Sequence, residues 1–72
     1  MERISIKTEF IKLNQFLKWA GIAETGAHAN QMIMDGLVKV NSQLETRRGR
    51  KIYDGDKVLL DNRYEFLVIR EG

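Results

Sequence analysis

The chain has 72 residues, no cysteine and a formal net charge of +2. A chain this short buries only about 60% of its unfolded surface, so one compact domain spanning residues 1–72 is expected, and the absence of cysteine excludes disulfides and thiolate metal sites. No apolar run approaches the roughly 20 residues of a membrane span, and the N-terminus lacks the apolar segment of a signal peptide, so a cytoplasmic protein without a membrane partner is expected.

The first predicted elements are a short strand and a short helix. Ile4 and Ile6 alternate with polar residues, which predicts a leading strand at a sheet edge. From Leu13 the apolar spacing becomes helical, with Asn14 as the expected N-cap and Gly21 as the end of the helix. A tight connection then leads to a second helix, so the two helices are expected to pack beside each other.

The second helix is predicted over residues 26–35, and a strand follows it directly. Thr25 is a good N-cap because its hydroxyl can accept a hydrogen bond from an unpaired amide of the first turn, and Gly36 is a good terminator because it adopts positive φ without strain. After Gly36 the period changes to two, with Val38 and Val40 on the buried face. This change of period predicts a half-buried strand that packs against the helix.

The C-terminal half alternates predicted turns and strands. Residues 41–42 are expected to form a two-residue hairpin turn, and residues 45–51, which have no apolar residue, an exposed loop. Further turns at residues 54–56 and 61–62 separate strands at 58–60 and 64–69. The predicted class is α+β, with two short helices packed on a small, mostly antiparallel sheet.

The sharpest chemical feature is a cluster of basic residues between positions 39 and 51. This stretch carries five basic residues against one glutamate, a net charge of +4, which leaves −2 for the rest of the chain. One cationic block on a slightly acidic body favours a defined anion site such as a nucleic-acid interface. The alternative is a solvated loop kept charged for solubility. The candidate phosphate contacts are Arg47, Arg48, Arg50 and Lys51 in the loop, with Lys39, Lys12 and Lys18 as possible extensions of the patch.

Three other features allow both a functional and a structural interpretation. His28, in the first turn of its predicted helix, either contacts a phosphate or base or is ordinary surface, and a lone histidine without cysteine is no metal site. Trp19 either stacks on a base or packs against the N-terminal strand, and packing is favoured. Asp54 and Asp56 are explained by turn hydrogen bonds, and no nucleophile and base accompany them. Neither an enzyme nor a cofactor is therefore expected.

The order and spacing of several short motifs resemble the S4 RNA-binding domain, in particular its small stand-alone bacterial members. The motif core covers about residues 12–60. It consists of Lys12-Leu13-Asn14, Leu17, Gly21, Thr25, Ala29, Ile33, the run Gly36-Leu37-Val38-Lys39-Val40-Asn41, and Gly55-Asp56. The resemblance implies an αL-type fold and binding of structured RNA, commonly ribosomal or transfer RNA, with the ribosome as a possible partner and a role in ribosome assembly or translation. We expect the protein to act as a monomer.

The sequence departs from the family pattern where the second helix commonly carries arginines. Gly26 and Asn30 occupy those positions, and Ser42 follows Asn41 where the family has glycine. The expected RNA contacts therefore centre on the loop 47–51 and its neighbours. The complete expected set is Lys12, Asn14, Lys18, Thr25, His28, Lys39, Asn41, Arg47, Arg48, Arg50 and Lys51. The competing hypothesis is a protein adaptor that presents the same loop to an acidic partner.

Overall fold

The computed structural model describes residues 1–72 and contains two helices and seven strands. The elements are, in chain order, β1 (Glu2–Ile6), β2 (Phe10–Lys12), α1 (Leu13–Trp19), α2 (Gly26–Met34), β3 (Val38–Val40), β4 (Gln43–Leu44), β5 (Lys51–Tyr53), β6 (Lys57–Leu60) and β7 (Tyr64–Arg70). Five strands form the large sheet, in the order β1-β7-β6-β3-β4, while β2 and β5 form a separate small sheet. Neither helix is long and apolar enough to cross a membrane.

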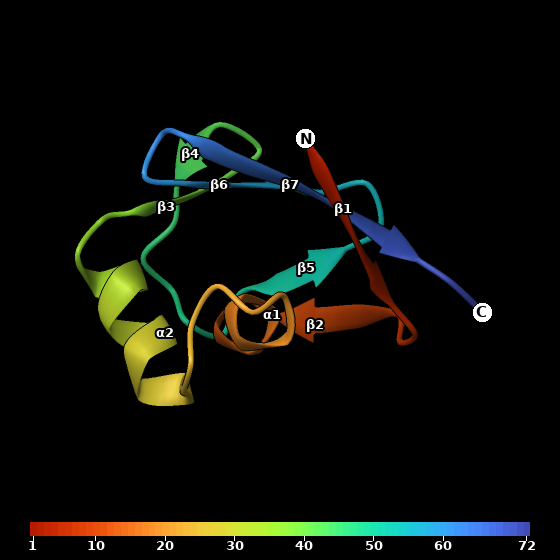
Figure 1. The fold of residues 1–72 in the computed structure, drawn as a ribbon, viewed down its shortest axis with the longest axis horizontal. Coiled ribbons are helices and arrows are strands. Elements are labelled where there is room, and N and C mark those ends of the chain that lie inside the picture. The colour runs from red at the N-terminus through yellow and green to blue at the C-terminus, as the bar shows by residue number, and fades with distance from the viewer.

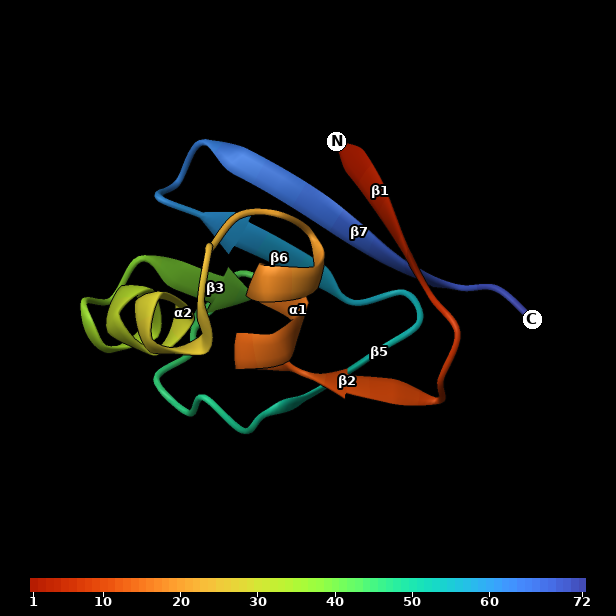
Figure 2. The same cartoon turned by 60° about the horizontal axis from the view of Figure 1, so that its bottom comes forward.

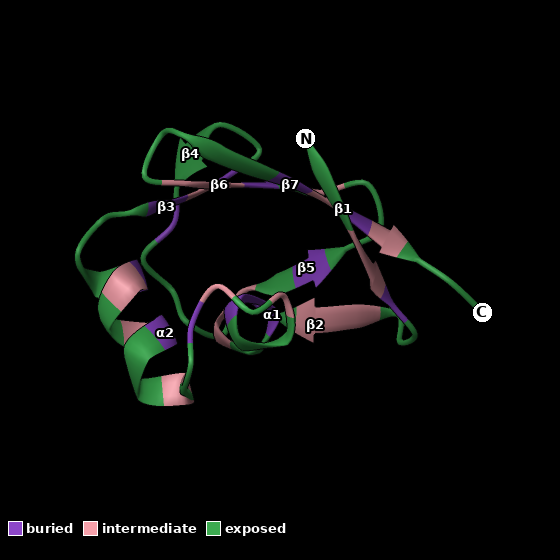
Figure 3. Ribbon diagram, viewed as in Figure 1, coloured by how far each residue is buried: buried purple, intermediate pink, exposed green.

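The elements are arranged in two layers. The large sheet forms one layer, and the other contains α2, α1 and the small sheet (Figures 1 and 2). The buried hydrophobic side chains of both layers belong to one cluster. Burial is concentrated on the facing sides of the layers, including α1, α2, β3 and β5 (Figure 3). The predicted α+β class, with two helices on a mostly antiparallel sheet, is confirmed.

The second helix begins and ends as the sequence predicts. The Thr25 hydroxyl accepts a hydrogen bond of 3.0 Å from the backbone N–H of His28, which satisfies one orphan donor of the first turn. The helix runs over Gly26–Met34, one residue shorter than predicted, and Gly36 follows with φ of 76°. Leu37 N–H then bonds to the carbonyl of Met32, which closes the helix end before β3 begins.

Two tight turns with positive φ join neighbouring antiparallel strands of the large sheet. Both residues of the 41–42 turn have positive φ, 51° and 72°, and so do both residues of the 61–62 turn. This backbone is that of type I′ hairpin turns, which connect β3 to β4 and β6 to β7. β1 lies at the sheet edge as predicted, and it pairs in parallel with β7 while the other pairs are antiparallel.

The small sheet was not predicted. Phe10 to Lys12 pair with Lys51 to Tyr53 in antiparallel register, so the supposed loop 45–51 ends in a strand. Ile52 is buried and Ile11 half-buried on the inner side, while the flanking side chains of β5 are exposed. Two strands of three residues each are too short for an alternating pattern to stand out from the helical spacing that begins at Leu13.

Replacing Gly36 by valine tests the helix end. A β-branched residue held at positive φ is strained by about 1 to 3 kcal/mol, although an added Cβ would meet only the Leu44 side chain, at an ordinary 3.9 Å. We expect the melting temperature to fall accordingly. Gly49→Val is the matched control, because Gly49 does not have positive φ and nothing lies within 4 Å of its added Cβ. Equal melting temperatures for the two variants would contradict this account of Gly36.

Candidate nucleic-acid interface

The cationic segment 47–51 is attached to the first turn of α1 by its own backbone. Leu13 N–H donates to the carbonyl of Arg50 at 2.8 Å, and Asn14 N–H donates to that of Arg48 at 3.0 Å. These bonds satisfy two amides that have no partner within the helix. The prediction that Asn14 caps α1 is wrong, because Lys12 occupies the N-cap and no side chain caps the helix. The segment is therefore fixed relative to α1.

Glu45 binds two arginines of this segment through its carboxylate, a role that was not predicted from the sequence. It is only 4% exposed, although it lies in a segment predicted to be an exposed loop. Its carboxylate accepts hydrogen bonds from Arg47 Nε and Nη2, both at 3.1 Å, from the Arg47 backbone N–H at 2.9 Å, and from Arg50 Nη1 at 2.9 Å. Two of the four predicted loop cations are thus paired within the protein.

The environment of Glu45 favours its charged form. Hydrogen bonds from the Arg47 side chain, with help from the Arg47 backbone and from Arg50, lower the pKa of Glu45 from the ordinary 4.5 to about 2, although burial by itself would raise it. The same bond raises the pKa of Arg47. The exposed guanidinium of Arg47 and the half-buried one of Arg50 are accordingly oriented by a permanent negative charge.

Three cations at this end of α1 have no carboxylate partner, because the ion pairs of the structure are those made by Glu45. Lys12 and Lys51 are directly opposite each other in the small sheet, so their side chains share one face, where like charges repel. Arg48 is exposed beside them, with its carbonyl on the first turn of α1. We call Lys12, Arg48 and Lys51 the cationic face. An anion bound there relieves the repulsion.

Two aromatic residues extend the cationic face along the small sheet. Phe10 and Tyr53 are also directly opposite, two residues from the lysine pair and on the same side. Their ring centroids lie 5.9 Å apart, and the Lys51 ammonium lies 4.7 Å from the Phe10 centroid, within cation–π range. The Tyr53 ring is exposed. A basic surface with aromatic rings is typical of nucleic-acid binding.

Other predicted site residues lie on α1, on α2 or at the N-cap of α2. Lys18 is exposed farther along α1, and the Asn14 side chain donates to Asn30 Oδ1 at 3.1 Å, which joins the two helices. The Thr25 hydroxyl is occupied as a helix cap. His28 is exposed, and its Nδ1 accepts a 3.4 Å bond from the Glu24 N–H. Only the opposite edge of its ring is available to a ligand.

Lys39 and Asn41 belong to the other layer. Lys39 lies on β3 between its neighbours β4 and β6, and its side chain is on the face opposite the buried Val38 and Val40. Asn41 is engaged internally, because its amide donates to Asp56 Oδ1 and its Oδ1 accepts from the Lys57 N–H, both at 3.0 Å. The structure therefore does not bring these two residues together with the cationic face.

The two turn aspartates are occupied by backbone groups. Asp54 Oδ1 accepts from the N–H of Arg70 and Asp56 Oδ2 from that of Tyr53, each at 2.7 Å. The turn interpretation is confirmed for Asp56, whereas the partner of Asp54 is on β7, outside the turn. No group of three or more His, Cys, Asp or Glu side chains is placed to hold a metal ion.

Comparison with known proteins gives consistent matches over nearly the whole chain. The family model described as "S4 domain" matches residues 4–68. The probable ribosome maturation protein RlbA of Bacillus subtilis (strain 168) is 42% identical over 66 residues, which are 92% of this chain and 93% of that protein. The solution structure of YbcJ from E. coli, described as revealing an αL motif involved in RNA binding, gives a TM-score of 0.72 at 34% identity, with 96% of this chain and 87% of that chain covered.

Proposed function

We propose an RNA-binding function for this chain because it belongs to the S4 domain family. The relative from Bacillus subtilis is named a probable ribosome maturation protein, and the E. coli structure is described by an RNA-binding motif. The first name supports a role in the maturation of ribosomes, and the second supports RNA as the ligand. The RNA that we propose is a folded segment of ribosomal RNA. The proposed role is binding without catalysis.

The observation that carries this proposal is the cationic face. Lys12, Arg48 and Lys51 converge on one end of α1 without a carboxylate to neutralise them. Phosphate groups supply the missing negative charge, and each phosphate that a cation neutralises releases condensed counterions. Arg48 can contact a phosphate through two N–H groups, whereas the two lysines act as point charges.

The rigidity of the cationic face favours folded RNA over a flexible strand. The backbones of Lys12 and Lys51 are fixed by strand pairing, and the backbone of Arg48 is held by its carbonyl on α1. Cations at a fixed spacing match phosphates at a fixed spacing, which a helix or a helical junction presents and an unstructured strand does not. The nearby Phe10 and Tyr53 rings pair with each other at 45°, so they do not form an open ladder for successive bases.

The salt dependence of RNA binding tests the proposal. If the cationic face neutralises about three phosphates, log affinity should fall with log salt with a slope of roughly −2 to −3. The variant Lys12→Ala/Arg48→Ala/Lys51→Ala should lose most of that slope and bind weakly, and its melting temperature should change little because these side chains have no ion pair. Titration of a folded ribosomal RNA fragment at several salt concentrations measures both quantities.

A matched variant removes the same charge elsewhere. Lys57, Arg63 and Arg70 are exposed cations on β6, on β7 and in the turn between them, and they make no salt bridge. The variant Lys57→Ala/Arg63→Ala/Arg70→Ala should therefore retain the slope. Equal losses in the two triple variants would show that only net charge matters and would overturn the proposed site. Equal affinity for poly-glutamate and for folded RNA would instead favour the adaptor hypothesis.

A further inference from the structure

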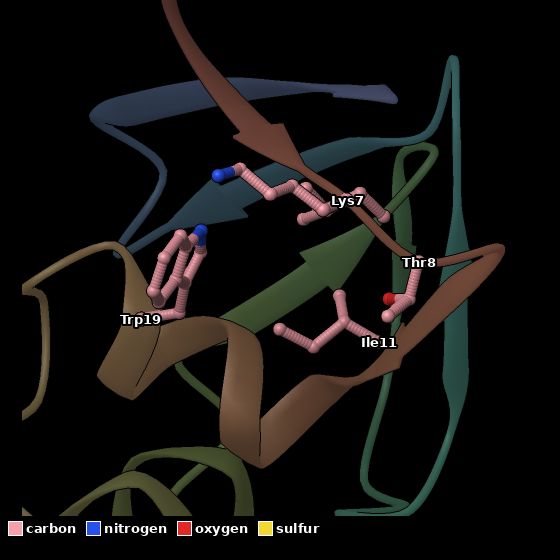
Figure 4. A pocket seen from close by; sticks show the side chains of 5 residues that line it. Lys7, Thr8, Ile11 and Trp19 are labelled. Atoms are coloured by element: carbon pink, nitrogen blue, oxygen red, sulfur yellow. The ribbon is translucent and has the colours of Figure 1, made fainter. Parts of the chain in front are cut away.

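An apolar hollow lies at the C-terminal end of α1, opposite to the end that carries the cationic face. One part, of about 210 Å³, is lined by Ile6, Lys7, Thr8, Ile11 and Trp19. An adjoining part, of about 340 Å³, is lined by Ile11, Gln15, Lys18 and Trp19. Figure 4 shows Trp19 and Ile11 facing each other across the first part, with the Lys7 side chain extending toward Trp19. No acidic residue lines either part.

Trp19 is exposed and at the same time held in place. Its indole N–H donates to the Ser5 carbonyl at 2.9 Å, which confirms the predicted packing against the N-terminal strand. The side chain nevertheless remains 61% exposed. A large aromatic ring that is fixed by its polar edge and open at its surface loses little conformational freedom on binding a flat partner.

We infer that the hollow around Trp19 is a stacking site for one unpaired nucleobase of the bound RNA. The inference deepens the proposed RNA-binding function and rests on it. Every base has a π-face that stacks on an aromatic ring, and the lysines at the rim of the hollow, Lys7 and Lys18, match the phosphates on either side of that base. A hollow with an apolar floor and a cationic rim fits this chemistry and does not fit a cationic ligand.

The hollow and the cationic face are connected along α1. Ile11 and Lys12 point to opposite sides of β2, but Gln15, which lines the hollow, lies one turn of α1 after Lys12 and one turn before Trp19. The seven residues of α1 span roughly 10 Å at 1.5 Å per residue, which corresponds to about three stacked nucleotides at 3.4 Å each. One strand of a folded RNA can thus place its phosphates on the cationic face and an unpaired base against Trp19.

Tryptophan fluorescence tests the inference directly, because Trp19 is the only tryptophan of the chain. The probe is an RNA hairpin with unpaired purines in its loop, compared with the same hairpin carrying abasic loop positions. We expect the first hairpin to quench Trp19 fluorescence. The abasic hairpin should bind the same wild-type protein about 5- to 150-fold more weakly and without quenching.

Protein variants separate stacking from simple contact. Trp19→Leu should bind the purine hairpin as weakly as the wild type binds the abasic one, whereas Trp19→Phe, which retains a ring, should fall between them. Tyr64→Leu removes an exposed aromatic ring on β7, in the other layer, and should bind as the wild type does.

The possible failures are distinguishable. Salt-dependent hairpin binding without quenching, and with unchanged affinity for Trp19→Leu, would overturn the stacking site and leave the proposed function standing. Absence of hairpin binding even at low salt would overturn both. A fluorescence shift that depends on protein concentration and not on RNA would instead identify the hollow as a contact between two copies of the chain.

Discussion

Truncation of Phe16 to alanine is expected to lower the melting temperature by at least about 15 °C and to leave a large fraction of the protein unfolded at 37 °C. Phe16 is fully buried on α1 and belongs to the single core cluster that joins the two layers. Phe→Ala substitutions in cores cost about 3 to 5 kcal/mol. A chain of 72 residues has a free energy of unfolding of only about 4 to 11 kcal/mol, from 0.05 to 0.15 per residue.

Thermal denaturation followed by circular dichroism measures this loss. Tyr64→Ala is the control, since Tyr64 is an aromatic residue of similar size that is half exposed, and its truncation should cost less than about 1 kcal/mol. RNA binding by Phe16→Ala should fall in proportion to its folded fraction. A melting temperature equal to that of Tyr64→Ala would contradict the placement of Phe16 in a shared core.

The elements that the sequence predicted well each have a local cause. Thr25 and Gly36 bound α2 through a side-chain cap and a positive φ, and both effects act within a few residues. The 61–62 turn likewise depends on two neighbouring residues that tolerate the left-handed region. The small sheet could not be predicted in this way, because residues 10–12 and 51–53 are far apart in the chain and each strand is too short to show its period.

The candidate site was predicted in composition but not in arrangement. Charge counting located the basic segment, yet it treated Arg47, Arg48 and Arg50 as equivalent cations of a free loop. Whether an arginine is available depends on where Glu45 points, and that follows from the hydrogen bonds that attach the segment to α1. A glutamate two residues before one arginine and five before another was the available indication.

Loss of the Glu45 charge is expected to destabilise the protein. The pKa of Glu45 is about 2 in the folded protein against an ordinary 4.5, and one pKa unit corresponds to about 1.4 kcal/mol. The shift corresponds to at most about 3.5 kcal/mol, and solvent screening at the exposed Arg47 guanidinium reduces this value. Glu45→Gln should therefore lower the free energy of unfolding by on the order of 2 to 3 kcal/mol at neutral pH. Arg48→Ala, which removes an exposed cation without an ion pair from the same segment, should leave stability nearly unchanged.

The pH dependence has a definite sign. Because folding lowers the pKa of Glu45, the unfolded chain binds the proton first as the pH falls. The stabilisation is complete above about pH 4.5, declines below it, and is lost once the pH passes about 2. The stability difference between wild type and Glu45→Gln should shrink over this window in urea denaturation series. The titration of the other carboxylates affects both proteins equally and therefore cancels in this difference. A difference that stays constant with pH would contradict the ion-pair account.

The same substitution should also change RNA binding, in the opposite direction to stability. Without the carboxylate, the guanidinium groups of Arg47 and Arg50 lose their internal partner and become available to phosphates. For the folded fraction of Glu45→Gln, the slope of log RNA affinity against log salt should then steepen by roughly 0.7 to 0.9 for each phosphate gained. The melting temperature of the same variant should fall. Partial unfolding alone lowers affinity and adds no phosphate contact, so a steeper slope in a less stable protein distinguishes release of the arginines from damage to the fold. An unchanged slope would mean that Arg47 and Arg50 do not face the RNA even when they are free.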